Sequence, residues 1–221
     1  MIVRVKVCGV RSTANALSCA EAGADWLGLN FHPTSARRVD PAVAAEIVRA
    51  LRGRAETVGL FVDRDPLEIR RLAESVGFDF VQLHGSEPVE SWAELADLRV
   101  IKAFRIGSIA DIDALAADLD RARTLGASLH AVLVDAHVPG LAGGTGVRIA
   151  VDLLDRLPLV ERLILAGGLT PENVAEAVAR VRPWMVDVAG GVESAPGEKD
   201  PERVARFVAE ARRASRGATT S

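Results

Sequence analysis

Two side chains at the ends of apolar segments are suited to proton transfer. Cys8 ends the first apolar segment, and Asp135 directly follows the apolar run 131–134. A thiol whose pKa is lowered by neighbouring positive groups can act as a base, and a carboxylate in such a position is costly to bury unless it is paired or lies at a pocket. The plainer interpretations are a buried thiol that acts as a small apolar side chain and a loop or helix-cap carboxylate.

Further polar residues follow other apolar runs. Asp187 lies between two valines and is a candidate for substrate binding or for an ion pair with a nearby Lys or Arg. Arg37 could hold a carboxylate through two parallel hydrogen bonds, unless it belongs to a solvated loop. Gln82 and His84 lie at the end of another run. Because His32 and His84 lack companion ligands at typical metal-site spacing, we predict no metal site.

Three groups of glycines favour anion binding. They are 143–146, which includes Gly144, then Gly167 with Gly168, and Gly190 with Gly191. Glycine-rich backbone can present N–H groups to a phosphate, although glycines also serve ordinary tight turns. Their recurrence predicts a phosphate site.

Eight short apolar runs, each followed by a longer segment of helical character, must position these residues. The strands are expected at 2–8, 26–31, 57–62, 78–83, 100–104, 129–135, 162–166 and 185–188. Helices are expected at 13–22, 42–51, 67–76, 174–181 and 202–214, several of them after an Asp-Pro or Thr-Pro start. This alternation is typical of parallel β-α-β units.

Eight such units predict one α/β domain, a single (β/α)8 TIM barrel over residues 1–210, with a disordered or frayed tail at 211–221. An open doubly wound sheet is the competing fold, but no Gly-x-Gly-x-x-Gly fingerprint follows the first strand. In a barrel the active site lies at the carboxyl ends of the strands, where the polar residues named above would meet.

Composition limits the partners. The 221 residues carry 27 basic and 30 acidic side chains and a net charge of -3, so we expect a small ligand and no nucleic acid. Two cysteines and the lack of a secretion signal predict a cytoplasmic protein. Charged residues interrupt every hydrophobic stretch, which excludes a bilayer-spanning segment.

The sequence resembles the phosphoribosylanthranilate isomerase family of tryptophan biosynthesis, from Lys6 to Phe207. The motifs that carry the resemblance are Lys6-Val7-Cys8-Gly9-Val10, Val81-Gln82-Leu83-His84-Gly85, Val100-Ile101-Lys102-Ala103-Phe104, Leu165-Ala166-Gly167-Gly168-Leu169-Thr170-Pro171-Glu172-Asn173-Val174 and Gly191-Val192-Glu193-Ser194.

The resemblance implies a cofactor-free isomerase that carries out an Amadori rearrangement. N-(5-phosphoribosyl)anthranilate would become 1-(2-carboxyphenylamino)-1-deoxyribulose 5-phosphate, with Asp135 protonating the ring oxygen and Cys8 removing the C2 proton. Arg37 would hold the anthranilate carboxylate, and Gln82 and His84 would line the pocket. The phosphate would lie among the glycines Gly144, Gly167, Gly168, Gly190 and Gly191.

Several positions differ from the family pattern, and two segments among them bear on the substrate. Residues 148–150 lack the usual aromatic pair, and Ala189-Gly190 stands where two serines are typical, which leaves backbone N–H groups to bind phosphate. The alternatives are therefore a paralogue that acts on another aminated phosphosugar and a non-catalytic ligand-binding barrel. The chain is expected to be a monomer or a homodimer.

Overall fold

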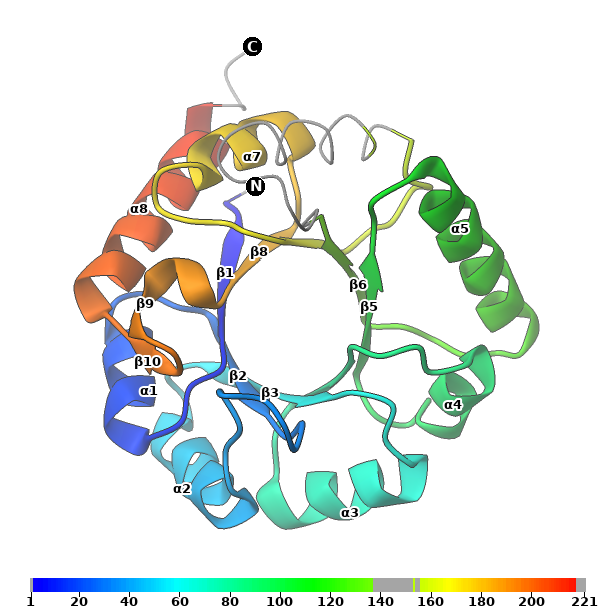
Figure 1. Ribbon diagram of the computed structural model, residues 1–221, viewed down its shortest axis with the longest axis horizontal. Coiled ribbons are helices and arrows are strands. Elements are labelled where there is room, and N and C mark those ends of the chain that lie inside the picture. Colours follow the sequence, from blue (N-terminus) through cyan, green and yellow to red (C-terminus); the bar gives the residue numbers. More distant parts are fainter. Residues whose placement is uncertain (1, 137–152, 154–155, 218–221) are drawn as a thin grey trace.

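The computed structural model describes residues 2–136, 153 and 156–217 as a closed parallel barrel with helices around it (Figure 1). The barrel strands are β1 (Arg4–Cys8), β2 (Trp26–Asn30), β3 (Glu56–Phe61), β4 (Phe80–Leu83), β5 (Val100–Arg105), β6 (Ala131–Asp135), β7 (Leu163–Ala166) and β8 (Met185–Val188). Each strand pairs in parallel with the next, and β8 pairs with β1. The predicted TIM barrel is confirmed.

The helices lie outside the barrel (Figure 1). They are α1 (Thr13–Glu21), α2 (Pro41–Leu51), α3 (Pro66–Val76), α4 (Val89–Glu94), α5 (Ile109–Thr124), α7 (Val174–Val181) and α8 (Pro201–Gly217). After β8 come a 3-10 turn, η1 (Gly190–Val192), and a short antiparallel hairpin of β9 (Glu193–Ala195) and β10 (Glu198–Lys199).

The predicted helix starts are built by local capping. Asp40 and Asp65 accept hydrogen bonds from the first turns of α2 and α3, and both helices begin at a proline. Because a proline has no N–H to leave unpaired and its φ is already helical, it suits this position. Gly77 ends α3 with φ of 79°, a conformation that favours glycine.

The structure differs from the predicted disordered or frayed tail over residues 211–217. Helix α8 continues to Gly217, because Ala211 and Ser215 are buried and Arg212 donates to the carbonyl of Gly23 and to Asp25. Residues 218–221 lie outside the described residues.

Two apolar clusters support the barrel. The larger one packs the outward-facing strand residues against the helices. The smaller one draws alternate residues from β2 to β8, among them Trp26, Phe80 and Leu133, and fills the barrel interior. The lower part of the barrel interior, away from the carboxyl ends of the strands, is therefore apolar. The polar interior residues lie toward the carboxyl ends of the strands.

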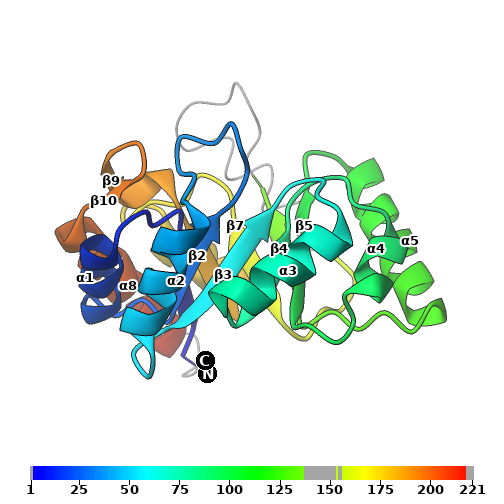
Figure 2. The ribbon, with the colours of Figure 1, turned by 90° about the horizontal axis from the view of Figure 1, so that it is seen from below.

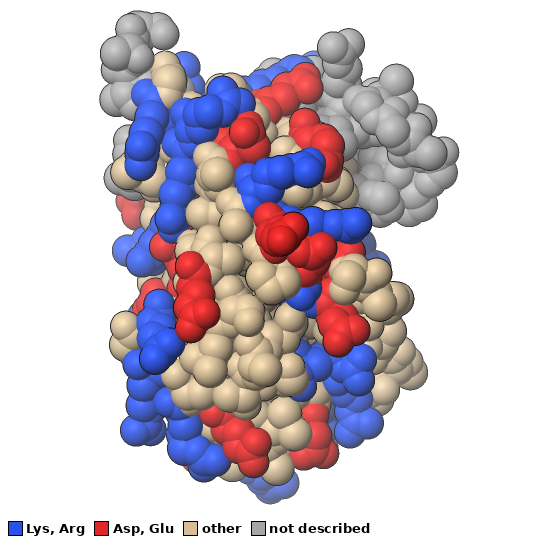
Figure 3. Space-filling model, turned by 90° about the vertical axis from the view of Figure 1, so that its left-hand side faces the viewer, with Lys and Arg blue, Asp and Glu red and all other residues tan. Residues whose placement is uncertain are grey.

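The surface carries both signs of charge. On the face that includes α8 and α1, basic and acidic side chains are interspersed (Figure 3). Among the described residues, no helix is both long and apolar enough to cross a membrane.

Candidate active site

A cavity of about 630 Å³ opens at the carboxyl ends of the barrel strands. It brings together most of the residues singled out in the sequence. Its lining includes Cys8, Arg37, His84, Asp135, Gly167, Gly168, Asp187, Gly190 and Gly191. These residues come from six different segments of the chain, and closure of the barrel places them around one space.

Cys8 lies beside a buried ion pair. Lys6 Nζ donates to Asp187 Oδ1 at 3.1 Å, and strand pairing between β1 and β8 sets these two residues side by side. Asp187 is thus paired with a lysine, as one of its two interpretations expected, and it also lines the cavity. The sequence places Lys6 near the end of the first strand but predicts no role for it.

The thiol of Cys8 is harder to ionise than the sequence suggested. Burial raises its pKa, and Asp187 adds to the rise, while the positive charge and hydrogen bond of Lys6 lower it. The net direction is upward, opposite to the lowering by positive neighbours that the sequence left open. Position at the end of a strand did not reveal how completely the thiol is removed from water.

Asp135 lies near His84, which in turn contacts Gln82. His84 Nε2 lies 3.9 Å from Asp135 Oδ2, and Gln82 Nε2 lies 2.8 Å from His84 Nδ1. Burial lowers the pKa of His84, and the nearby Asp135 carboxylate opposes this lowering with a smaller effect. The net lowering favours the neutral ring. With Gln82 Nε2 at Nδ1, the other ring nitrogen, Nε2, is the one that faces Asp135.

Gln82 does not line the cavity as expected. Its side chain is completely buried behind His84, because it points into the barrel one layer below the cavity. Gln82 therefore orients His84 and does not contact the cavity itself.

Arg37 is held by a carboxylate from the short hairpin that follows β8. Its Nε and Nη2 donate to the two oxygens of Glu193, each at 2.7 Å. The loop that carries Arg37 is shaped by Asn30 and Ser35, since Asn30 donates to the Ser35 hydroxyl and this hydroxyl accepts from the Arg37 backbone N–H. Glu193 belonged to a recognised motif, but its partner is far away in the sequence.

The two glycine loops after β7 and β8 touch each other. Gly167 and Gly168 have φ of 103° and 64°, and a side chain at Gly191 would overlap the Leu169 carbonyl. Only glycine fits these positions without strain. Gly144, the remaining phosphate candidate, lies outside the described residues.

A metal centre has no obvious ligands in the described part of the chain. No group of three or more His, Cys, Asp or Glu side chains lies close enough together there to hold an ion.

Comparison with known proteins agrees with this geometry. The N-(5'-phosphoribosyl)anthranilate (PRA) isomerase family matches residues 5–210. A relative of that name from Geobacter sulfurreducens is 46% identical over 211 residues, covering 96% of this chain and 99% of the relative. Another from Roseiflexus sp. is also 46% identical, with coverage of 97% and 100%.

Solved structures give the same result. The PRA isomerase of Thermotoga maritima is 35% identical, with a TM-score of 0.82 and coverage of 95% of this chain and 98% of that one. A PRA isomerase structure in complex with reduced 1-(o-carboxyphenylamino)-1-deoxyribulose 5-phosphate has a TM-score of 0.80 at 34% identity, with the same coverage. The chain belongs to the N-(5'-phosphoribosyl)anthranilate isomerase family.

Proposed function

We propose that this chain converts N-(5'-phosphoribosyl)anthranilate to 1-(2-carboxyphenylamino)-1-deoxyribulose 5-phosphate in tryptophan biosynthesis, with Asp135 as the acid and Cys8 as the base. The observation that carries the assignment of the two residues is their position. They end β6 and β1, on different sides of the barrel, and line the same cavity (Figure 1). A substrate between them would meet an acid and a base on opposite sides.

The reaction needs two proton transfers. Asp135 gives its proton to the furanose ring oxygen as the C1–O bond breaks, and the electron pair of the anilino nitrogen forms a protonated Schiff base. Cys8, as thiolate, takes the proton from C2, and the electrons of that C–H bond form the enolamine. Tautomerisation of the enolamine gives the ketone, so atoms and charges balance without an added co-reactant.

Neighbouring residues support these roles. Lys6 stabilises the thiolate form of Cys8, which offsets part of the cost of burying it. His84 faces Asp135, and Asp187 lies at the cavity wall, where its carboxylate can accept hydrogen bonds from sugar hydroxyls.

The two ends of the substrate need separate anion sites. Arg37 lies at one side of the cavity and suits the anthranilate carboxylate. The glycine loops 167–168 and 190–191 suit the phosphate, with backbone N–H groups in place of hydroxyl donors.

Steady-state assays test the substrate. The purified protein is offered N-(5'-phosphoribosyl)anthranilate and an aminated phosphosugar that lacks the anthranilate ring. Turnover of the first supports the proposal. Turnover of the second alone would indicate a paralogue, and tight binding of a product analogue without any turnover would indicate a ligand-binding barrel.

The oligomeric state and the cellular location of the chain are further parts of the proposal. One similar structure is described as monomers of a dimeric isomerase from Thermotoga maritima, so both a monomer and a homodimer suit this chain. Light scattering of the purified protein distinguishes them. For a biosynthetic enzyme of this class we infer a cytoplasmic location, and fractionation of cells tests it.

A further inference from the structure

Glu193 lies at the centre of a compact charged cluster at the rim of the cavity. It binds Arg37 through both carboxylate oxygens, and its Oε1 also accepts from Lys199 Nζ at 2.6 Å and from the Gly197 backbone N–H at 3.1 Å. The Glu193 and Lys199 side chains are 6% and 0% exposed. The cluster joins the loop after β2 to the β9–β10 hairpin, both of which lie on the same side of the molecule (Figure 2).

Glu193 remains ionised in this position. Burial alone would raise its pKa, but hydrogen bonds from Arg37 and Lys199 lower it below the usual value. One negative charge therefore faces two positive charges, which leaves the cluster with a net charge of +1 next to the cavity. This excess charge favours an anionic group of the substrate.

The Arg37 guanidinium has one edge occupied and another available. Glu193 uses the edge formed by Nε and Nη2. The other edge, formed by Nη1 and the second Nη2 hydrogen, can donate to a carboxylate in the same two-bond geometry, and among the described residues no acceptor is bonded to Nη1. A side chain at Gly9 would approach Arg37 Cδ to 2.6 Å, so this glycine makes room for the arginine.

We propose that Glu193 is the positioning residue for substrate selection, because it holds Arg37 with its second edge toward the cavity, ready for the carboxylate of an aminobenzoate. The inference rests on the proposed role of Arg37 in the isomerase. Lys199 anchors Glu193, since its Nζ also donates to the Ala189 carbonyl at 3.1 Å. Glu193 does not contact the reacting atoms, so it acts on binding and on specificity.

The test compares two product analogues that differ in one group. One is reduced 1-(2-carboxyphenylamino)-1-deoxyribulose 5-phosphate, and the other is the same compound without the carboxylate. We expect Glu193→Gln to weaken binding of the first analogue by about tenfold, because Arg37 is then held less firmly for its charge-assisted contact with the carboxylate. Binding of the second analogue should stay within about twofold of the wild-type value. KM should rise in the same proportion, with kcat nearly unchanged. Equal weakening for both analogues would overturn the proposal.

A double-mutant cycle with Arg37→Ala separates positioning from a general structural effect. If Glu193 acts through Arg37, Glu193→Gln has no further effect on KM once Arg37 is absent. A further rise in KM of the same size in that background would contradict the proposal. Glu198→Gln, which changes an exposed residue on the same hairpin, is the matched control and should behave as wild type.

Two additional variants keep the test informative if Glu193→Gln does not fold. Glu193→Asp keeps the charge but shortens the side chain, and Glu193→Gln with Lys199→Met removes both buried charges together. Each should discriminate less between the two analogues than the wild type does, and wild-type discrimination in both would overturn the proposal. If Arg37→Ala itself leaves KM unchanged, the proposed role of Arg37 fails. If Arg37→Ala raises KM and the Glu193 variants do not, only the inference about Glu193 fails.

Discussion

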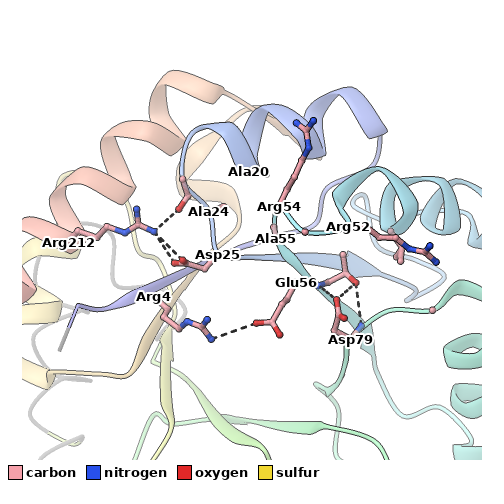
Figure 4. A pocket seen from close by; sticks show the side chains of 15 residues that line it. Arg4, Ala20, Ala24, Asp25, Arg52, Arg54, Ala55, Glu56, Asp79 and Arg212 are labelled. Atoms are coloured by element: carbon pink, nitrogen blue, oxygen red, sulfur yellow. Dashed lines mark hydrogen bonds and ion pairs between the residues drawn. The ribbon is translucent and has the colours of Figure 1, made fainter.

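The two ends of the barrel both carry many charged side chains, but they pair them in different surroundings. At the amino-terminal end, a pocket of about 720 Å³ holds pairs such as Arg212 with Asp25 and Arg4 with Glu56, whose side chains are 28–43% exposed (Figure 4). At the carboxyl end, the pair of Lys6 and Asp187 is buried.

The difference shows which end has been organised for chemistry. Exposed pairs contribute little and cost little, because water screens them. Buried ionic groups are expensive to remove from water and require complete partners. The carboxyl end holds such groups next to Cys8 and Arg37, where their electric fields reach a bound substrate. The amino-terminal pocket holds ion pairs that satisfy one another, and this end of a TIM barrel serves stability.

The largest expected contrast is between carboxylates at the two ends. Asp135→Asn should lower kcat by about 10²- to 10⁴-fold, because an amide cannot supply the acid proton. Asp25→Asn, at the amino-terminal end, should leave kcat within about twofold. Steady-state kinetics of both variants measure the contrast, and similar losses in the two would remove the distinction between the ends.

Stability should show the next largest contrast. Lys102 donates to Glu87 at 2.7 Å, and both side chains are buried on the carboxyl side of the barrel. Glu87→Gln leaves the Lys102 charge without its partner and should lower the free energy of unfolding by about 3–5 kcal/mol. Urea denaturation measures the loss, and a change below about 1 kcal/mol, which is typical of exposed pairs, would contradict it.

The pH dependence of catalysis should respond to Lys6. Burial already raises the pKa of Cys8, and the positive charge of Lys6 opposes that rise. Lys6→Met removes the opposing charge and leaves Asp187 unpaired, and both changes raise the thiol pKa further. If the Cys8 thiolate is the base, as proposed, the ascending limb of kcat/KM against pH should move to higher pH. A limb that stays in place or moves to lower pH would show that Lys6 does not act on Cys8.

The smallest effect is expected at the amino-terminal pocket itself. Arg212→Ala removes the contacts to Asp25 and the Gly23 carbonyl, which are partly exposed, and should cost about 1 kcal/mol or less of unfolding free energy. KM and kcat should stay at wild-type values. A change in KM for the substrate would reveal that the two ends are coupled, which the comparison does not anticipate.

The sequence predicted the fold well because its signals are local. Strand-length apolar runs and Asp-Pro helix starts act within a few residues, and the structure forms β and α elements where they predict them. Helices α4 and α5 were not predicted by range; α4 is a short helix without a side-chain cap.

The site was less predictable where it depends on tertiary contacts. Arg37 and Glu193 are 156 residues apart, so neither residue alone indicates the pair. The direction of the Cys8 pKa shift depends on burial, and the place of Gln82 behind His84 depends on which layer of the barrel it faces. These properties belong to the packed structure and have no local sequence pattern.

The central claim is that Cys8 removes the proton from C2 of the substrate. Substrate carrying deuterium at ribose C2 is mixed with the wild type and with Cys8→Ala, and mass spectrometry follows both product formation and loss of the label. We expect the wild type to form product as deuterium leaves C2, and the variant to leave the substrate labelled and unconverted. Product formation by Cys8→Ala at the wild-type rate would contradict the account.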